Sequence, residues 1–266
     1  MFYDYHIHTQ FSGDSDTPVR SMLDRAVSYG LKEVCITDHI DYHYPNDPDL
    51  FTFDIEEYFS VLSSLQQEYQ SVLSIRIGME YGLTPELGGH LASLAASYPF
   101  DFIIGSSHVV DQMDPYYPVY WEGKKEEEGI FRYFESILEN LNFCSDFDVY
   151  GHLDYIIRYL PSGKKSYSYE IYQEIIEQCL KRLISMGKGI EVNTAGLKYG
   201  LGAPNPRPEI LQKYRELGGE IITIGSDGHK PEHLAFAFDQ IQELLEQCGF
   251  RYLTLFRKRK PEFIHI

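Results

Sequence analysis

Short apolar segments alternate with longer amphipathic segments along most of the chain. The short segments are rich in β-branched and aromatic residues, as buried strands are. The helices expected between them return the chain to the same end of the sheet each time, so neighbouring strands pair in parallel. The pattern predicts an α/β fold of seven strand–helix units, either a closed barrel or an open, doubly wound sheet. The predicted strands are residues 3–8, 33–37, 75–80, 102–106, 149–152, 189–192 and 221–224.

Several helix boundaries can also be read from the sequence. Thr17 followed by Pro18 predicts an N-cap and a first helical turn, and Gly30 ends the apolar stripe that follows. Asp54 and Glu57 form a variant of the capping box before the next stripe. No linker rich in proline, glycine or serine interrupts residues 1–266, so we expect one domain. Further helical stripes lie at residues 130–141, 171–183 and 234–245.

Composition and charge narrow the range of partners. The 266 residues are 43% hydrophobic and 15% aromatic, enough for a substantial core. Lys and Arg number 23 against 40 Asp and Glu, and the resulting net charge of −17 disfavours binding to a nucleic-acid backbone. No apolar run approaches the ~20 residues of a membrane-spanning helix, and the first residues lack the layout of a secretory signal. The basic run 257–260 is interpreted as a solvated tail.

Cysteine usage bears on the compartment. The four cysteines are scattered, and no two form a Cys-X-X-Cys pair. A cytoplasmic protein with reduced thiols is therefore expected. The net charge and the lack of a long apolar run further predict no nucleic-acid or membrane partner. The positions are Cys35, Cys144, Cys179 and Cys248.

Two segments, 40–53 and 110–126, are longer than ordinary connections. Both are rich in tyrosine, proline and aspartate, and both follow the C-terminal end of a predicted strand. Because α/β folds build their sites at that end, we expect these segments to border a site rather than to decorate a remote surface.

Histidines and acidic residues concentrate where the predicted strands end. Because parallel strands end on one face, these side chains are expected to converge. A single histidine at a strand end is more often structural, and a His-X-His pair alone is weak evidence. The whole set in one place indicates a metal site, and imidazole and carboxylate ligands without thiolate suit zinc, manganese or iron. The set consists of His6, His8, His39, His108, His152 and His229, with Asp38, Glu80, Asp154 and Asp227.

The other four histidines are interpreted differently. His90 lies in a helical segment, His265 lies near the end of the chain, and His233 lies within the last helical stripe, so all three are expected to be structural or at the surface. His43 stays open, because its long segment borders the expected site.

The order and spacing of these motifs resemble those of the polymerase and histidinol phosphatase (PHP) superfamily over residues 1 to about 230. The resemblance implies a distorted (β/α)7 barrel with a metal site at the C-terminal ends of the strands, and so favours the barrel over the open sheet. The opening His-X-His-Thr-X-Phe-Ser-X-Asp, ending at Asp14, is most similar to the stand-alone histidinol phosphatases. So is the segment from Glu191 to Lys198, which reads EVNTAGLK. The motifs that carry the resemblance are His6-Ile7-His8, Thr37-Asp38-His39, Gly78-Met79-Glu80, Gly105-Ser106-Ser107-His108, Gly151-His152-Leu153-Asp154 and Gly225-Ser226-Asp227-Gly228-His229.

The resemblance also implies three divalent cations, which would be zinc, manganese or iron. Asp14 stands where many superfamily members have a histidine, which would weaken the third ion or favour a harder metal. The implied ligands are His6, His8, Glu80 and Asp227 for the first ion, Glu80, His108 and His152 for the second, and Asp14, His39 and His229 for the third.

The activity implied is metal-dependent hydrolysis of L-histidinol phosphate to L-histidinol and phosphate, a step of histidine biosynthesis. Arg158 is the first candidate for binding the phosphate, because arginine can form two parallel hydrogen bonds with it. Lys198 and Arg207 are second candidates, and Asp41, Glu122 and the nearby His43 are candidates for the rest of the substrate. Asp154 and His229 remain alternatives for the general acid.

Two rival functions stay open on the sequence alone. The same site could serve a superfamily phosphoesterase that acts on nucleotides or on another small phosphoester. A non-catalytic metal-binding protein is the second rival. The sequence does not fix the oligomeric state.

Overall fold

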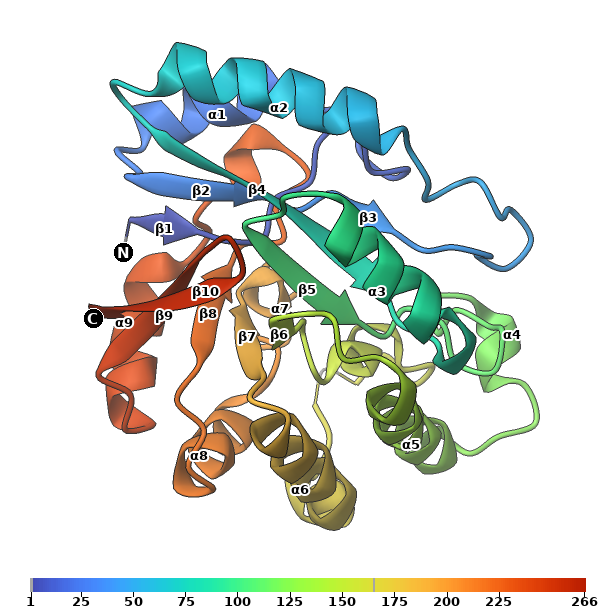
Figure 1. The fold of residues 1–266 in the computed structure, drawn as a ribbon. Coiled ribbons are helices and arrows are strands. Elements are labelled where there is room, and N and C mark those ends of the chain that lie inside the picture. Colours follow the sequence, from blue (N-terminus) through green and yellow to red (C-terminus); the bar gives the residue numbers. More distant parts are fainter. Residues whose placement is uncertain (1, 165) are drawn as a thin grey trace.

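Parallel strands form a nearly closed barrel with helices around it (Figure 1). The computed structural model describes residues 2–164 and 166–266. Within that part, seven strands follow one another around the barrel in sequence order, as the pattern of short apolar segments predicts. They are β1 (Tyr3–Asp4), β2 (Glu33–Ile36), β4 (Ser74–Gly82), β5 (Phe102–Ser106), β6 (Val149–Tyr150), β7 (Gly189–Asn193) and β8 (Ile222–Gly225).

The first and last strands meet, which makes the sheet a barrel rather than an open sheet. The Tyr5 amide donates to the Ile224 carbonyl at 3.0 Å, and Ile7 forms a parallel bridge with Gly228. The short strand β3 (His39–Ile40) pairs with β4 beyond the end of β2. Strand β1 is shorter than the predicted strand 3–8, because regular pairing ends at Asp4.

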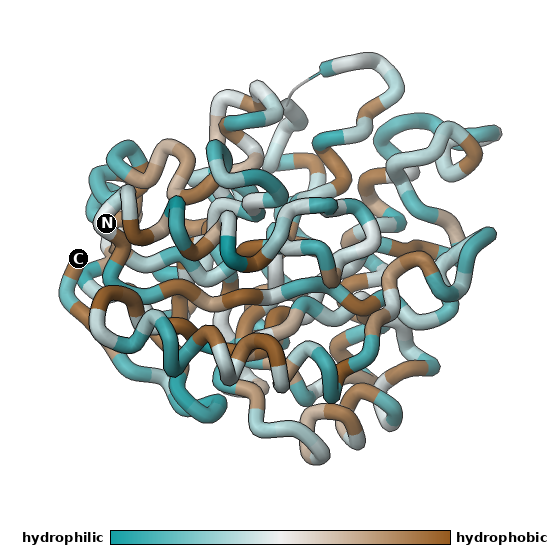
Figure 2. The backbone as a smooth tube through the Cα atoms, turned by 90° about the horizontal axis from the view of Figure 1, so that it is seen from above, coloured by the Kyte–Doolittle hydropathy of each residue, from teal (hydrophilic) through white to brown (hydrophobic). Residues whose placement is uncertain are grey.

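Helices cover the outside of the barrel and bury their apolar stripes against it (Figure 1). In α1, for example, the stripe Val19, Met22, Leu23 and Ala26 is buried. The hydrophilic stretches of the chain lie mostly in the outer loops (Figure 2). No helix in the described ranges has the length and apolar character needed to cross a membrane. The longer helices are α1 (Val19–Ser28), α2 (Ile55–Tyr69), α3 (Gly88–Ser97), α5 (Glu126–Phe143), α6 (Tyr169–Ser185), α8 (Pro208–Glu216) and α9 (Phe238–Gln247).

Short helical turns follow several strand ends. They are α4 (Pro118–Trp121), α7 (Ala195–Lys198) and the 3-10 turns η1 (Pro85–Leu87), η2 (Tyr155–Tyr159) and η3 (Pro231–His233).

Helix starts agree only in part with the sequence pattern. The predicted cap of α2 is confirmed, since the Asp54 side chain accepts from the Glu57 amide at 3.0 Å. Thr17 does not cap α1. Its hydroxyl donates instead to the carbonyl of His229 at 2.7 Å and ties the start of α1 to the loop after β8. The last helix begins at Phe238 rather than near 234, because Ala237, with φ of 56°, leaves the helical region just before it.

The end of the chain is an antiparallel hairpin of β9 (Tyr252–Arg257) and β10 (Lys260–His265), so the interpretation of residues 257–260 as a tail is wrong. The hairpin lies against the N-terminal ends of the barrel strands (Figure 1). Arg259 Nε donates to Asp148 at 2.5 Å, just before β6. The Lys258 amide donates to Asp101 at 3.0 Å, just before β5. The basic run therefore pairs with acidic side chains at the end of the barrel opposite the strand C-termini.

Candidate metal centre

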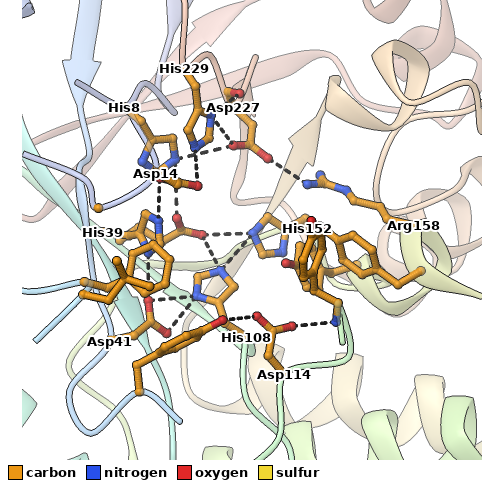
Figure 3. A pocket seen from close by; sticks show the side chains of 18 of the residues that line it. His8, Asp14, His39, Asp41, His108, Asp114, His152, Arg158, Asp227 and His229 are labelled. Carbon is orange, nitrogen blue, oxygen red and sulfur yellow. Dashed lines mark hydrogen bonds and ion pairs between the residues drawn. The ribbon is translucent and has the colours of Figure 1, made fainter. Parts of the chain in front are cut away.

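The C-terminal ends of the strands surround a pocket of about 470 Å³ (Figure 3). Both long segments, 40–53 and 110–126, contribute to its wall, as expected. Eight of the nine predicted metal ligands line it, and the ninth, His6, lies buried behind Glu80. Residues that lie up to 221 positions apart in the chain are thus brought together because parallel strands end on one face. The eight are His8, Asp14, His39, Glu80, His108, His152, Asp227 and His229.

Glu80 is the centre of the cluster. One of its oxygens, Oε2, lies 3.2 Å from His6 Nε2 and 3.5 Å from His8 Nε2. The other, Oε1, lies 3.3 Å from His108 Nε2 and 3.0 Å from His152 Nε2. The carboxylate therefore stands between two separate groups of buried imidazoles, each of which could hold one ion. Asp227 completes the first group, with Oδ1 at 3.5 Å from His8 Nε2.

A third group lies at the open side of the pocket. Asp14 places one oxygen 3.3 Å from His39 Nε2 and the other 3.1 Å from His229 Nε2. The Asp14 side chain is 46% exposed, whereas the side chain of Glu80 is 3% exposed. The imidazoles of His8, His39 and His229 also lie close enough to share one ion. Of the three groups, this one is the most accessible to solvent.

Buried carboxylates hold the far side of these imidazoles. Asp41 contacts Nδ1 of His39 at 2.8 Å and Nδ1 of His108 at 2.9 Å. Glu191 contacts Nδ1 of His6 at 2.5 Å. A carboxylate on Nδ1 fixes the ring and leaves Nε2 as the ligand atom, an arrangement common in metal sites. Asp41 reaches the pocket, as predicted, but its oxygens are engaged by histidines rather than left for a substrate amine.

Glu80 and His8 have the charge states of metal ligands. Burial alone would raise the pKa of Glu80, but the neighbouring His6 and His108 outweigh it and hold that pKa well below its usual range. Burial lowers the pKa of His8 to about 3, and the nearby His229 adds to this effect, so the His8 ring is neutral. An anionic carboxylate and a neutral imidazole are the forms that bind metal. Burial opposes the protonation of His6 and His108, but the neighbouring carboxylates outweigh it and raise the pKa of both rings, so a metal ion that binds there displaces protons.

The ligand chemistry fits the expected cations. The pocket combines imidazole nitrogens with carboxylate oxygens and has no thiolate among its lining residues. Within the described chain, the buried Nε2 atom of His6 forms no hydrogen bond, and the atom it faces is Glu80 Oε2 at 3.2 Å; the buried Nδ1 atom of His152 forms none either. Such a set of donors suits zinc, manganese or iron.

Arg158 and Lys198 lie at the pocket, as predicted. Arg158 donates at 3.0 Å to each of Asn205, Asp227 and Asn193, one bond from each guanidinium nitrogen. Its guanidinium also lies over the rings of Tyr155 and Tyr199, with the central carbon 5.1 Å from each centroid. Lys198 donates from Nζ to the Asp227 carbonyl at 3.2 Å. Both cations are therefore fixed beside the first group of ligands.

Three other predicted residues lie away from this pocket. Asp154 accepts from Asn205 Nδ2 at 2.6 Å and from the Arg207 amide at 3.1 Å, and it does not line the pocket. The Arg207 side chain pairs with Glu209 instead of facing the site. His43 lines a neighbouring hollow. Asp154 follows a strand end, as the residues of the cluster do, but its side chain does not point into the pocket.

Sequence reasoning missed several residues of the pocket. His233, expected at the surface of a helix, lies in η3 with Nδ1 3.5 Å from Lys198 Nζ. Asp114 was not singled out within its long segment. The tyrosine content of the two long segments signals part of the aromatic wall, but it does not say which rings face inward, and Tyr155, Tyr159 and Tyr199 lie outside those segments. That wall comprises Tyr44, Phe51, Tyr116, Tyr117, Tyr155, Tyr159 and Tyr199.

Comparisons with known proteins agree with this geometry. The PHP domain matches residues 4–195. A histidinol-phosphatase of Lactococcus lactis subsp. lactis (strain IL1403) is 30% identical over 263 residues, which span 97% of this chain and 95% of the relative. A probable histidinol-phosphatase of Clostridium acetobutylicum is 31% identical over 265 residues, 99% of this chain and 100% of the relative.

The fold agrees more closely than the sequence does. The crystal structure of histidinol phosphate phosphatase from Lactococcus lactis, complexed with zinc, L-histidinol and phosphate, has a TM-score of 0.91 to this chain at 30% identity. The match covers 98% of both chains. The chain therefore belongs to the PHP domain family, among its members of the histidinol-phosphatase type.

Proposed function

We propose that this protein is a metal-dependent phosphomonoesterase that hydrolyses L-histidinol phosphate to L-histidinol and phosphate. One observation carries the proposal: a buried carboxylate, Glu80, stands between two groups of imidazoles, with the fixed guanidinium of Arg158 beside them. The Lactococcus lactis relative, whose structure is complexed with zinc, L-histidinol and phosphate, supports both the metal and the substrate.

We assign nine side chains to three divalent cations. Zinc is our first choice, because the relative's structure contains it, and manganese and iron remain alternatives. Bound divalent cations would supply charge neutralisation and a lowered pKa for a water. The ligands are His6, His8, Glu80 and Asp227 for one ion, Glu80, His108 and His152 for a second, and Asp14, His39 and His229 for a third.

Arg158 binds the phosphate in this proposal. A guanidinium has five N–H groups, of which three are used by Asn193, Asn205 and Asp227. Each terminal nitrogen keeps one N–H, enough for two phosphate oxygens. Because the guanidinium is already held in place, little conformational freedom is lost on binding. Lys198, which donates to the backbone carbonyl of Asp227, adds a second positive charge.

His229 serves the third ion rather than the leaving group. Its Nε2 faces Asp14 at 3.1 Å and its Nδ1 faces the Asp227 carbonyl at 3.1 Å. Both nitrogens are thus engaged within the cluster. Asp154, the alternative general acid, is held by Asn205 away from the pocket. We therefore assign it to positioning the loop that contains Asn205 and Arg207.

We further propose a one-domain enzyme of histidine biosynthesis that acts in the cytoplasm. All four cysteines are unpaired, which suits a reducing compartment. The net charge of −17 supports a small phosphate ester over nucleic acid as the substrate.

Phosphate release from a panel of substrates tests the function. The zinc-loaded protein should hydrolyse L-histidinol phosphate with a higher kcat/KM than glycerol phosphate, a nucleoside monophosphate or a short oligonucleotide at fixed salt. Chelation should abolish the activity, and added zinc should restore it. A higher kcat/KM for the nucleotide or oligonucleotide would instead identify a phosphoesterase of that class, and a metal-loaded protein without any activity would identify a metal-binding protein.

A further inference from the structure

A carboxylate outside the metal cluster lies in the pocket wall. Asp114, from the loop between β5 and α4, is only 7% exposed. Its Oδ2 accepts from the Tyr44 hydroxyl at 2.6 Å, and its Oδ1 accepts from the Tyr116 amide at 2.7 Å (Figure 3). Both oxygens act as acceptors, which fits the ionised form.

The other carboxylates of the pocket already have cationic or imidazole partners. Asp14, Asp41, Glu80 and Asp227 each contact at least one histidine ring. Within residues 2–164 and 166–266, Asp114 has no histidine, lysine or arginine within 4.0 Å. It is thus the one carboxylate of this wall whose charge lacks a partner in the described chain.

A buried charge without a partner costs free energy. Burial raises the pKa of Asp114, and the bonds from Tyr44 and Tyr116 offset only part of that cost. Those two donors fix the carboxylate without neutralising it. A cation entering the pocket would supply the missing charge.

The position of Asp114 suits a second recognition point on a small phosphate ester. In Figure 3, Asp114 lies below His108, on the side of the histidine cluster away from Asp227. Arg158, the proposed phosphate ligand, contacts Asp227. Arg158 and Asp114 line the same pocket, so both are available to one ligand, Arg158 to its phosphate and Asp114 to its organic part.

Aromatic rings surround this end of the pocket. Phe51 stacks on His39 at 4.3 Å between centroids and meets Tyr44 edge to face at 4.7 Å. Tyr116 and Tyr117, with rings 5.0 Å apart, remain 60% and 41% exposed at the pocket mouth. Aromatic faces attract cations and cover planar rings, so this wall favours a cationic, ring-bearing ligand.

We propose that Asp114, held by Tyr44 and the Tyr116 amide, binds the ammonium group of the substrate and selects amino-bearing phosphate esters over neutral ones. The inference deepens the proposed function and rests on it. It replaces Asp41 as the partner of the amine, since the oxygens of Asp41 are engaged by His39 and His108. It also replaces Glu122, which does not line the pocket.

Two substrates and two variants test this role. L-Histidinol phosphate and 3-(imidazol-4-yl)propyl phosphate, which lacks only the amine, are compared on the zinc-loaded protein. Asp114→Asn should lower kcat/KM about 10- to 100-fold for the amine substrate, the usual size of a lost bond between charged groups, and change it less than about threefold for the analogue. Tyr44→Phe, which only loosens the carboxylate, should lower kcat/KM for the amine substrate in the same selective way, by about 3- to 10-fold.

Controls separate this proposal from the proposed function. Glu122→Gln, which changes an exposed acidic residue of the same long segment 110–126, should leave both substrates unaffected, and metal content should equal that of the wild type in every variant. Equal losses for both substrates in Asp114→Asn and in Tyr44→Phe, or no preference of the wild type for the amine, would overturn the role of Asp114 alone. A wild type that hydrolyses p-nitrophenyl phosphate but neither imidazole substrate would overturn the proposed function, and the role of Asp114 with it.

Discussion

Replacing Glu80 by Gln tests the idea that one carboxylate serves two metal sites. Glu80 is buried and contacts the Nε2 atoms of four histidines at 3.0 to 3.5 Å, two on each oxygen. Glutamine keeps the size of the side chain but removes its charge and turns one oxygen into an N–H donor. That donor points at one pair of histidines and cannot bind a cation. The substitution should therefore disturb two ions while the barrel stays intact.

The size of the effect can be bracketed from a neighbouring residue. Glu191 contacts Nδ1 of His6, accepts from the His152 amide at 2.9 Å and does not line the pocket, so Glu191→Gln weakens supporting contacts without removing a metal ligand. Losses of that kind typically cost 10- to 100-fold in metal affinity or activity. Glu80→Gln removes a shared anionic ligand and should exceed the upper figure. We expect kcat/KM to fall by more than about 100-fold, or about 2.7 kcal/mol in activation free energy.

The assay combines kinetics with metal analysis on the same samples. Glu80→Gln should lose activity and at least one ion per chain, and Glu191→Gln should show a smaller loss. Glu68→Gln, at an exposed pair with Arg20, serves as the surface control and should match the wild type. Unchanged turnover and metal content in Glu80→Gln, in a folded protein, would refute the bridging role.

Three further predictions address other parts of the molecule. Arg158→Lys should lower kcat/KM by about 100-fold, because lysine cannot replace three fixed bonds and a planar grip on phosphate; a loss below threefold would argue against that role. Asp14→Ala should reduce metal content measured by mass spectrometry from three ions to two per chain, and an unchanged count would remove Asp14 from the third site. Glu33→Gln should destabilise the protein in urea unfolding at pH 7 by about 3 kcal/mol, because it breaks a buried pair with Arg76. Burial opposes the ionisation of Glu33, but bonds from Arg76 and Tyr5 outweigh it and lower its pKa, so its contribution is present above about pH 4.5 and lost as pH falls further. A wild-type advantage that stays constant down to pH 3 would contradict this assignment.

The order and parallel pairing of the strands and the core of the site could be predicted because they depend on short-range patterns, whereas the choice of a barrel over an open sheet came from the family resemblance. Apolar segments of strand length, each followed by a helical stripe, define the order of the strands, and parallel pairing then places His8, Glu80 and His108 on one face. To predict that these residues share one face, only their positions relative to the strand ends are needed. The family resemblance supplied their grouping around separate ions.

Features that depend on loop direction could not be predicted in the same way. Asp154 and Asp227 both follow strand ends, but Asn205 holds Asp154 away from the pocket while Asp227 meets His8. Asp114 is held in the pocket wall by the Tyr44 hydroxyl, from another long loop, together with the Tyr116 amide. Such contacts join segments far apart in the sequence, and no local pattern encodes them.

The C-terminal hairpin could not be predicted from the sequence either. Its turn is formed by Lys258 and Arg259 with positive φ angles of 51° and 64°, where asparagine or glycine is the usual signal. The basic pair looked like a solvated run, whereas Asp101 and Asp148 at the starts of β5 and β6 hold it in place.

Anomalous diffraction from crystals of the zinc-loaded protein tests the central claim most directly. The account predicts three zinc peaks at the C-terminal mouth of the barrel, two of them on either side of Glu80 and the third between Asp14, His39 and His229. Zinc peaks elsewhere on the surface, or a mouth without zinc at concentrations that saturate activity, would contradict it.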